Sequence, residues 1–218
     1  MRDELYAAKR RELGADAIEA YRARYAQECP SQTALLLISD RLRDSEQLID
    51  AALPSTRVIS VSYDLWSLGD LQAAIARGGP STYERIGVID HGHARELRLL
   101  RRSCPGGQLM LSRESLAPAR DQPRAKSLRG FFVWLAGRID GDGGIDLLSC
   151  CDASALPALE ELTGVRWSTA SEGATAADNK QLTIDTDGLD CAAAHYFHLG
   201  QLAGWNSAIP PPVEAIQR

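Results

Sequence analysis

The stretch that decides the fold is residues 85–93, which read Arg-Ile-Gly-Val-Ile-Asp-His-Gly-His. Mostly apolar, β-prone residues lead to a His-Gly pair at the point where a strand is expected to end. Residues 144–152, Gly-Ile-Asp-Leu-Leu-Ser-Cys-Cys-Asp, repeat this arrangement and end in two thiols beside a carboxylate. If the two strands are parallel neighbours, their carboxyl ends bring His91 and a cysteine to the same edge of the sheet. The two stretches therefore predict a Cys-His pair.

Short apolar strands alternate with helical patterns along most of the chain. Residues 34–39, Ala-Leu-Leu-Leu-Ile-Ser, form a continuous apolar run that is typical of a strand buried on both faces. Further strands are expected near residues 57–62, 85–90, 144–149 and 165–170. This alternation predicts an α/β fold, a three-layer αβα sandwich with a mainly parallel central sheet and right-handed crossovers.

The connecting segments are also assigned from local patterns. Helices are expected at residues 45–52, 68–76, 128–139 and 155–162. The Asp-Gly-Asp-Gly run at 140–143 is interpreted as a turn, because it lacks the later ligands of a calcium loop. Residues 96–111 are expected to form a hairpin outside the main sheet, residues 118–126 an exposed loop, and residues 181–185 a terminal strand.

Three parts of the chain are expected. Residues 1–30 form an amphipathic helix, residues 31–190 the α/β domain, and residues 191–218 a C-terminal helix followed by a Pro-rich tail. The N-terminal helix is expected to pack on its own domain, with a protein partner as the alternative.

Composition excludes several classes of function. The net charge of -5 argues against a nucleic-acid-binding surface. No segment reaches the ~18 apolar residues of a membrane span, and the first residues lack the apolar core of a signal peptide, which predicts no membrane partner and a cytoplasmic location.

The five cysteines are odd in number and lack CxxC spacing, which favours free thiols. His195 and His198 lack a third ligand and are interpreted as structural, so no metal or cofactor is expected.

The order of the motifs resembles that of the caspase-like cysteine peptidases, in which a strand-end His-Gly and a strand-end Cys form the dyad. More narrowly, residues 88–92, 96–99 and 146–152 resemble the caspase-like domain at the front of giant bacterial repeat adhesins, whose signatures are Ser-His-Gly and Tyr-Gly-Cys-Asp. Residues 162–171, Leu-Thr-Gly-Val-Arg-Trp-Ser-Thr-Ala-Ser, resemble that family's Leu-Thr-Gly-Ala-Asp-Val-Ala-Ala-Ser segment. The similarity spans about residues 34–187.

The resemblance implies a caspase-like fold and a cysteine endopeptidase with the dyad His91 and Cys151. Aligning Leu-Ser-Cys-Cys-Asp with Tyr-Gly-Cys-Asp puts Cys150 where the family has a small residue, which makes Cys151 the nucleophile. A thiolate attacks a carbonyl, and an adjacent imidazole stabilises the thiolate and later protonates the leaving amine. The amides of Gly92 and Cys151 would hold the oxyanion. His93 is the competing base.

Three carboxylates are candidates for binding a basic P1 side chain of a protein or peptide substrate, namely Asp90, Asp146 and Asp152. Asp90 stands where the family has a small polar residue before His-Gly, and a nearby carboxylate can raise the basicity of an imidazole. For Asp146 and Asp152 the alternative is a solvated turn carboxylate.

Two other functions stay open. The first is a catalytically inactive caspase-like module that binds a protein partner through the same cleft. The second is a flavodoxin-like or receiver-like domain, in which Asp40 after the first strand would accept a phosphate. Receiver chemistry needs an acidic cluster and a later strand-end Lys, and the sequence has neither in place.

Overall fold

The computed structural model of this 218-residue chain describes residues 32–90, 100, 123–148, 155–169, 181–183, 192–202 and 205–208. The N-terminal helix expected at 1–30 lies outside the described residues. So does the hairpin expected at 96–111, apart from Leu100, which is buried in the core.

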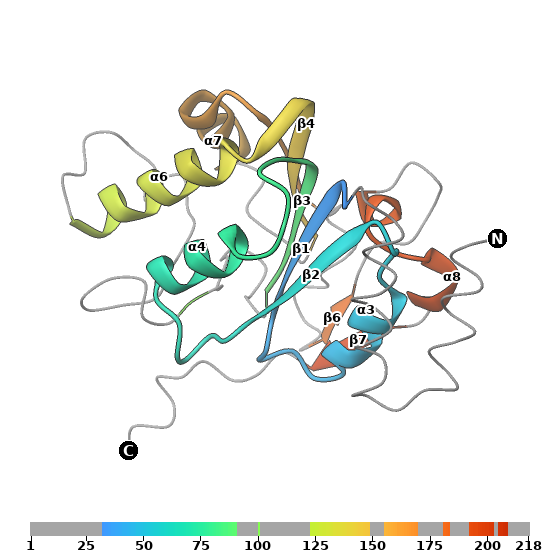
Figure 1. Ribbon diagram of the computed structural model, residues 1–218. Helices are drawn as coiled ribbons and strands as arrows, with labels where there is room; N and C mark the ends of the chain where they lie inside the picture. Colours follow the sequence, from blue (N-terminus) through green and yellow to red (C-terminus); the bar gives the residue numbers. More distant parts are fainter. Residues whose placement is uncertain are drawn as a thin grey trace, which may run out of the picture.

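A five-stranded parallel sheet forms the centre of the molecule (Figure 1). Its strands are β1 Ala34–Ser39, β2 Thr56–Val61, β3 Tyr83–Ile89, β4 Ile139–Leu147 and β5 Arg166–Thr169. The strand order is β2-β1-β3-β4-β5, and every neighbouring pair runs parallel. The predicted α/β fold with a mainly parallel central sheet is confirmed.

Helices and short elements connect and follow these strands. They are α3 Ser45–Ala51, α4 Leu68–Ala76, α6 Pro123–Ala136, α7 Leu156–Thr163, the 3-10 helix η3 Ala192–His195, and α8 Leu199–Leu202. Two further strands, β6 Gln181–Thr183 and β7 Asn206–Ala208, pair antiparallel in a sheet of their own. The strand expected at residues 181–185 therefore exists as β6, but it does not join the central sheet.

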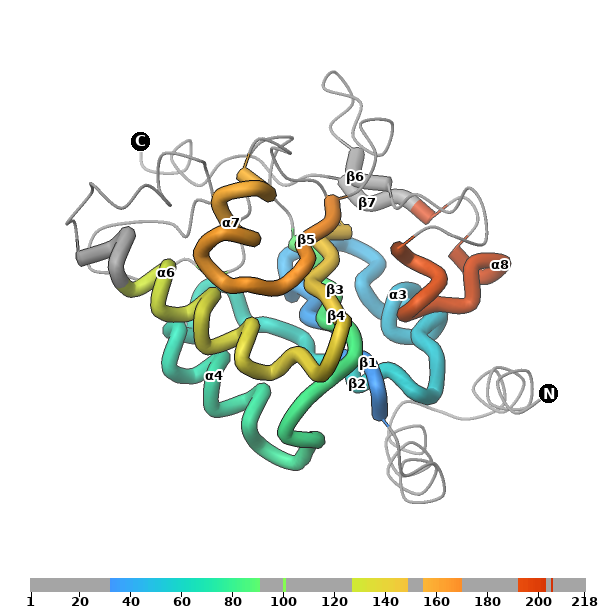
Figure 2. Tube along the Cα trace, turned by 90° about the horizontal axis from the view of Figure 1, so that it is seen from above, coloured from blue at the N-terminus to red at the C-terminus, as the bar shows by residue number. Residues whose placement is uncertain are grey.

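Strand β1 shows why both faces of the sheet must be covered. All six of its residues are buried, and successive side chains point to opposite faces. Leu35 and Leu37 pack in a cluster with residues of α4, α6 and α7, whereas Leu36 and Ile38 pack in a second cluster with residues of α3, η3 and α8. Figure 2 shows α4, α6 and α7 on one side of the sheet and α3 and α8 on the other. We name these the α4/α6/α7 face and the α3/α8 face.

Two predicted boundaries were wrong. Residues 123–126 belong to α6, which ends at Ala136, and not to a loop. Proline is favourable in the first turn of a helix, where its missing N–H has no partner to lose, and Pro123 therefore begins the helix. The turn expected at 140–143 lies inside β4, which already pairs with β3 at Tyr83–Ile139. A register shift between Tyr83 and Arg85 accommodates the glycine-rich run as an irregularity of the strand.

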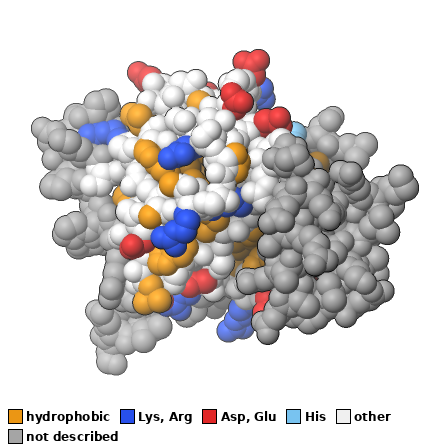
Figure 3. Space-filling view, in the orientation of Figure 1, with side chains coloured by type: hydrophobic (Ala, Val, Ile, Leu, Met, Phe, Trp, Pro, Cys, Tyr) orange, Lys and Arg blue, Asp and Glu red, His pale blue; other side chains and the backbone are white. Residues whose placement is uncertain are grey.

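The surface of the described residues is mixed in character. On the face drawn in Figure 3, apolar side chains and charges of both signs are interspersed. The large hydrophobic residues that are exposed in the described part of the chain are Leu65 and Val133. In that part of the chain, no helix has the length and apolar character needed to cross a membrane.

Candidate functional site

The carboxyl ends of β3 and β4 lie next to each other. The Cα register pairs Val88 with Leu147, and the amide of Leu148 donates to the carbonyl oxygen of Val88 at 2.9 Å. Strand β3 ends at Ile89 and is followed by Asp90. The prediction that the strands leading to the His-Gly and Cys-Cys motifs are parallel neighbours is confirmed.

The residues of the predicted dyad themselves lie outside the described residues. The other predicted or competing site residues that follow the two strands also lie outside the described residues. Together with the dyad, the set is His91, Gly92, His93, Cys150, Cys151 and Asp152. Their roles stay predictions. The structure describes the other two predicted site residues, Asp90 and Asp146.

Asp90 is a buried carboxylate at the end of β3. Its exposed fraction is 0%, and it interacts with other residues of the chain. The neighbouring strand β1 ends at Ser39, which is equally buried, and the register pairs the preceding residues Ile38 and Ile89. A carboxylate is costly to bury unless it is paired or hydrogen-bonded, so Asp90 is part of the packed strand end. Its predicted contact with substrate stays a prediction.

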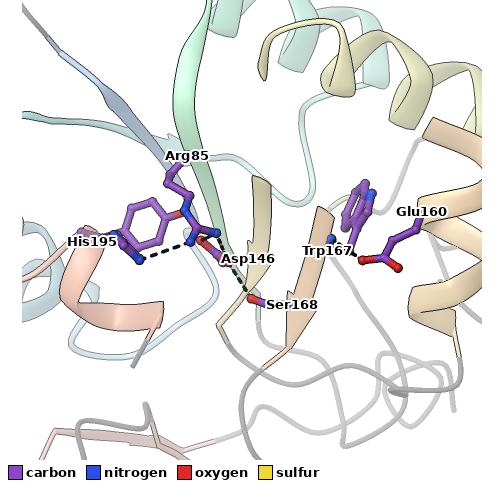
Figure 4. Close-up of polar contacts among 7 residues, drawn as sticks. Arg85, Asp146, Glu160, Trp167, Ser168 and His195 are labelled. Atoms are coloured by element: carbon purple, nitrogen blue, oxygen red, sulfur yellow. Dashed lines mark hydrogen bonds and ion pairs between the residues drawn. The ribbon is translucent and has the colours of Figure 1, made fainter. Parts of the chain in front are cut away.

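Asp146 is also buried, with 1% of its surface exposed, and it binds three donors on the α3/α8 face (Figure 4). The Arg85 guanidinium lies 3.1 Å away, from Nη1 to Oδ1. The Ser168 hydroxyl donates to Oδ1 at 2.6 Å, and the Tyr196 hydroxyl donates to Oδ2 at 2.6 Å. Asp146 is therefore not a solvated turn carboxylate. Its predicted role in binding a basic side chain stays a prediction, and the structure adds that Arg85 already compensates its charge.

Two glycines make room for this arrangement. A Cβ atom on Gly87 would lie 2.9 Å from Cζ of the Tyr196 ring, and one on Gly144 would lie 3.1 Å from Nη1 of Arg85. Real Cβ contacts are rarely so short. Glycine inside a strand often marks a position where another group approaches the backbone closely. The glycines of β3 and β4 thus let Tyr196 and Arg85 lie directly on the sheet.

Burial keeps Tyr196 protonated to a higher pH than an exposed tyrosine. Desolvation, together with the charge and hydrogen bond of Asp146, raises the pKa of Tyr196 well above its ordinary value of 10.0, while Arg85 opposes this rise. The phenol therefore acts as a donor to Asp146 at neutral pH. We name the set Arg85, Asp146, Ser168 and Tyr196 the Asp146 cluster.

His195 extends this cluster to the surface. Its Nε2 lies 3.3 Å from Nη2 of Arg85, and its side chain is exposed (Figure 4). Because a guanidinium only donates, this contact is a hydrogen bond in the tautomer whose Nε2 is unprotonated. Within the described ranges, no group of three or more His, Cys, Asp or Glu residues is arranged to hold a metal ion.

Asp40 joins two other strand ends on the same edge of the sheet. Its Oδ1 accepts from the amide of Tyr63 and its Oδ2 from the hydroxyl of Ser62, each at 3.0 Å. Asp40 thus holds the segment after β2 against the end of β1. The strand order β2-β1-β3-β4-β5 also occurs in flavodoxin-like sheets, so topology alone does not separate the receiver-like alternative.

Sequence reasoning missed Arg85, Ser168 and Tyr196 as partners of Asp146. The available signal was the pair of glycines in β3 and β4, which interrupt otherwise β-prone stretches.

Comparisons of the chain with protein-family models, with curated proteins and with solved structures gave no significant match. The resemblance to caspase-like peptidases therefore rests on the quoted motifs.

Proposed function

We propose that this protein is a cysteine endopeptidase in which His91 and Cys151 form the catalytic dyad. The observation that supports the proposal is the parallel pairing of β3 with β4 up to Val88 and Leu147. His91 directly follows Asp90 in the sequence, and Cys151 is three residues beyond Leu148. Carboxyl ends of adjacent parallel strands open onto the same edge of a sheet, which is where such folds bind their ligands.

The proposed reaction proceeds in two halves. The Cys151 thiolate attacks the carbonyl carbon of a peptide bond, and the amides of Gly92 and Cys151 donate to the oxyanion. The C–N bond then breaks, the His91 imidazolium gives its proton to the leaving amine, and a thioester remains on Cys151. Water, deprotonated by neutral His91, attacks the thioester and releases the carboxylic acid and the thiolate.

A preference for a basic P1 residue is the finer part of the proposal. Arg85 compensates the charge of Asp146 and Asp90 is buried at the end of β3, so the preference depends mainly on Asp152. Matched peptides that differ only in Arg, Ala or Asp at P1 test it, and we expect fastest cleavage after Arg. The substrate is a peptide or protein, and the cytoplasmic location and a partner for the N-terminal helix remain expectations.

The activity test offers the pure protein a mixed peptide library and compares wild type with four variants. Wild type and Cys150→Ala are expected to cleave, whereas Cys151→Ala and His91→Ala are expected to lose cleavage at least 1000-fold, on the order of a full loss of nucleophile or base. His93→Ala is expected to retain most activity. Equal and negligible cleavage by wild type and Cys151→Ala would contradict the proposal and favour the inactive module that binds a partner.

A further inference from the structure

We infer that Asp146 is a positioning residue for the proposed dyad, because the Asp146 cluster fixes β3 against β4 directly before the strand ends that lead, in the sequence, to His91 and Cys151. The inference rests on the proposed function. Asp146 contacts neither the substrate nor the reacting atoms in this scheme, and it acts through the strands on which the dyad depends.

The register places the cluster close to the strand ends. Asp146 is paired with Gly87 of β3 on one side and with Ser168 of β5 on the other. Only two further residues of β3, Val88 and Ile89, separate this level of the sheet from Asp90. A change in the relative position of β3 and β4 at Asp146 is therefore passed on to both strand ends over a very short distance.

The donors reach Asp146 from three separate elements. Arg85 is on β3, Ser168 is on β5, and Tyr196 directly follows η3. Hydrogen bonds to an ionised carboxylate are shorter and stronger than neutral ones, and they depend on direction. One carboxylate on β4 thus aligns the strands on both its sides with the segment that covers them.

Apolar packing alone does not give this alignment. On the opposite face, β3 and β4 are held by Ile86, Val88, Ile145 and Leu147, whose contacts are non-directional. A buried polar group can specify one arrangement because any other arrangement leaves it without partners. A slip of β3 along β4 would move Arg85 away from Asp146 and would press the Tyr196 ring onto a residue other than Gly87.

Three variants disturb the cluster without altering the dyad. Tyr196→Phe removes one donor and keeps the ring on Gly87. Ser168→Ala removes another donor from the β5 side. Gly87→Ala keeps all donors but places a methyl group 2.9 Å from the Tyr196 ring and 2.9 Å from Cδ1 of Leu36.

Ser67→Ala is the matched control, because it lowers stability at a distance from the cluster. The Ser67 side chain accepts from the Asp70 amide in a capping box at the start of α4, on the other face of the sheet. The melting temperature of every variant and of the control is measured. A change in the reactivity of Cys151 that appears in a cluster variant, but not in a control that has lost as much melting temperature, reports positioning rather than a general loss of stability.

The readout is the pH dependence of alkylation at Cys151 by iodoacetamide, followed by mass spectrometry in a Cys150→Ala background. An imidazole partner lowers the apparent pKa of a thiol below its unperturbed value of about 8.5. We expect a lowered value in the parent protein, a shift towards 8.5 in the three cluster variants, and no shift in Ser67→Ala.

Two other results would be decisive in different ways. A lowered apparent pKa in the parent that all folded cluster variants retain would overturn the positioning role and leave the proposed dyad intact. An apparent pKa near 8.5 in the parent itself would remove the dyad and this inference with it. If Gly87→Ala does not fold, Tyr196→Phe and Ser168→Ala carry the test, since both only delete a hydroxyl group.

Discussion

Tyr196 shows how one buried side chain joins distant parts of the chain. Its hydroxyl donates to Asp146, and its carbonyl oxygen accepts from the amide of Leu53 at 2.8 Å and from the Thr56 hydroxyl at 3.3 Å. The exposed fraction of Tyr196 is 0%. A buried polar group that loses its partner costs more than the bond itself contributes, so the loss of any one of these contacts is expected to destabilise the fold.

Stability is expected to fall at alkaline pH partly through this phenol. Burial raises the pKa of Tyr196 in the folded state above the unfolded value of 10.0, so the resulting stability is fully present below pH 10 and is lost as pH rises towards the folded pKa. Tyr196→Phe is expected to cost about 1–2 kcal/mol at pH 8 and to show a shallower loss above pH 10. Guanidinium unfolding of both proteins between pH 8 and 11 measures this, and parallel curves would contradict it.

The partners of Asp146 are contacts between side chains that the sequence alone does not predict. Asp146 was identified from its place in a strand that ends in cysteines. Its three donors lie 22, 50 and 61 residues away along the chain, and no local pattern links them to it. The register of β3, β4 and β5 brings Arg85 and Ser168 close to Asp146, and the packing of the segment after η3 brings Tyr196 there.

Helix α4 shows an element whose two ends are both fixed by side chains. Ser67 and Asp70 form a capping box at its start, which satisfies amides that have no partner within the helix. At its end the Arg57 guanidinium of β2 donates to the carbonyl oxygens of Ala74, Ile75 and Arg77. The same guanidinium donates to the Tyr83 hydroxyl at 2.8 Å and so links α4, β2 and β3.

Arg57→Ala is expected to destabilise the protein by about 2–4 kcal/mol, because it leaves several partly buried carbonyl groups and the Tyr83 hydroxyl without a donor. Arg57→Lys is expected to lose less, since an ammonium can reach some of these acceptors but lacks the planar fork of the guanidinium. Urea unfolding gives both values. A cost below 0.5 kcal/mol for Arg57→Ala, roughly that of an ordinary surface substitution, would contradict this role.

The bounds of a helix or strand were predicted well where the sequence signal lies within or directly beside the element. The bounds of β1 and α4 were predicted correctly because their signals are local. The signal is an apolar run of strand length for β1 and the Gly78-Gly79-Pro80 run directly after the helix for α4. Strand β4 was predicted too short because its Asp-Gly-Asp-Gly run is typical of a turn, and only pairing with Tyr83 makes it part of a strand. The start of α6 was missed because residues 118–126 were read by their polarity, although Pro123 suits a helix start.

The C-terminal segment that carries Tyr196 completes the core on the α3/α8 face. Phe197, Leu202 and Trp205 pack with α3 and with the side chains of β1 on the α3/α8 face, and Ala52 and Phe197 form a β-bridge. The segment that carries Tyr196 is thus held by α3 as well as by Asp146. The sequence predicted the parallel sheet and the neighbouring strands that lead to His91 and Cys151. It did not predict that the C-terminal segment packs against α3 and β1.

Covalent labelling with a peptide-derived electrophile tests the proposed dyad most directly. The pure protein is treated with a peptidyl vinyl sulfone that carries Arg at P1, and every cysteine peptide is then quantified by mass spectrometry. We predict one dominant adduct at Cys151, its retention in Cys150→Ala, and its loss in His91→Ala, whose thermal unfolding should stay close to that of wild type. A dominant adduct at Cys150, or a Cys151 adduct that forms equally fast in His91→Ala, would contradict the dyad.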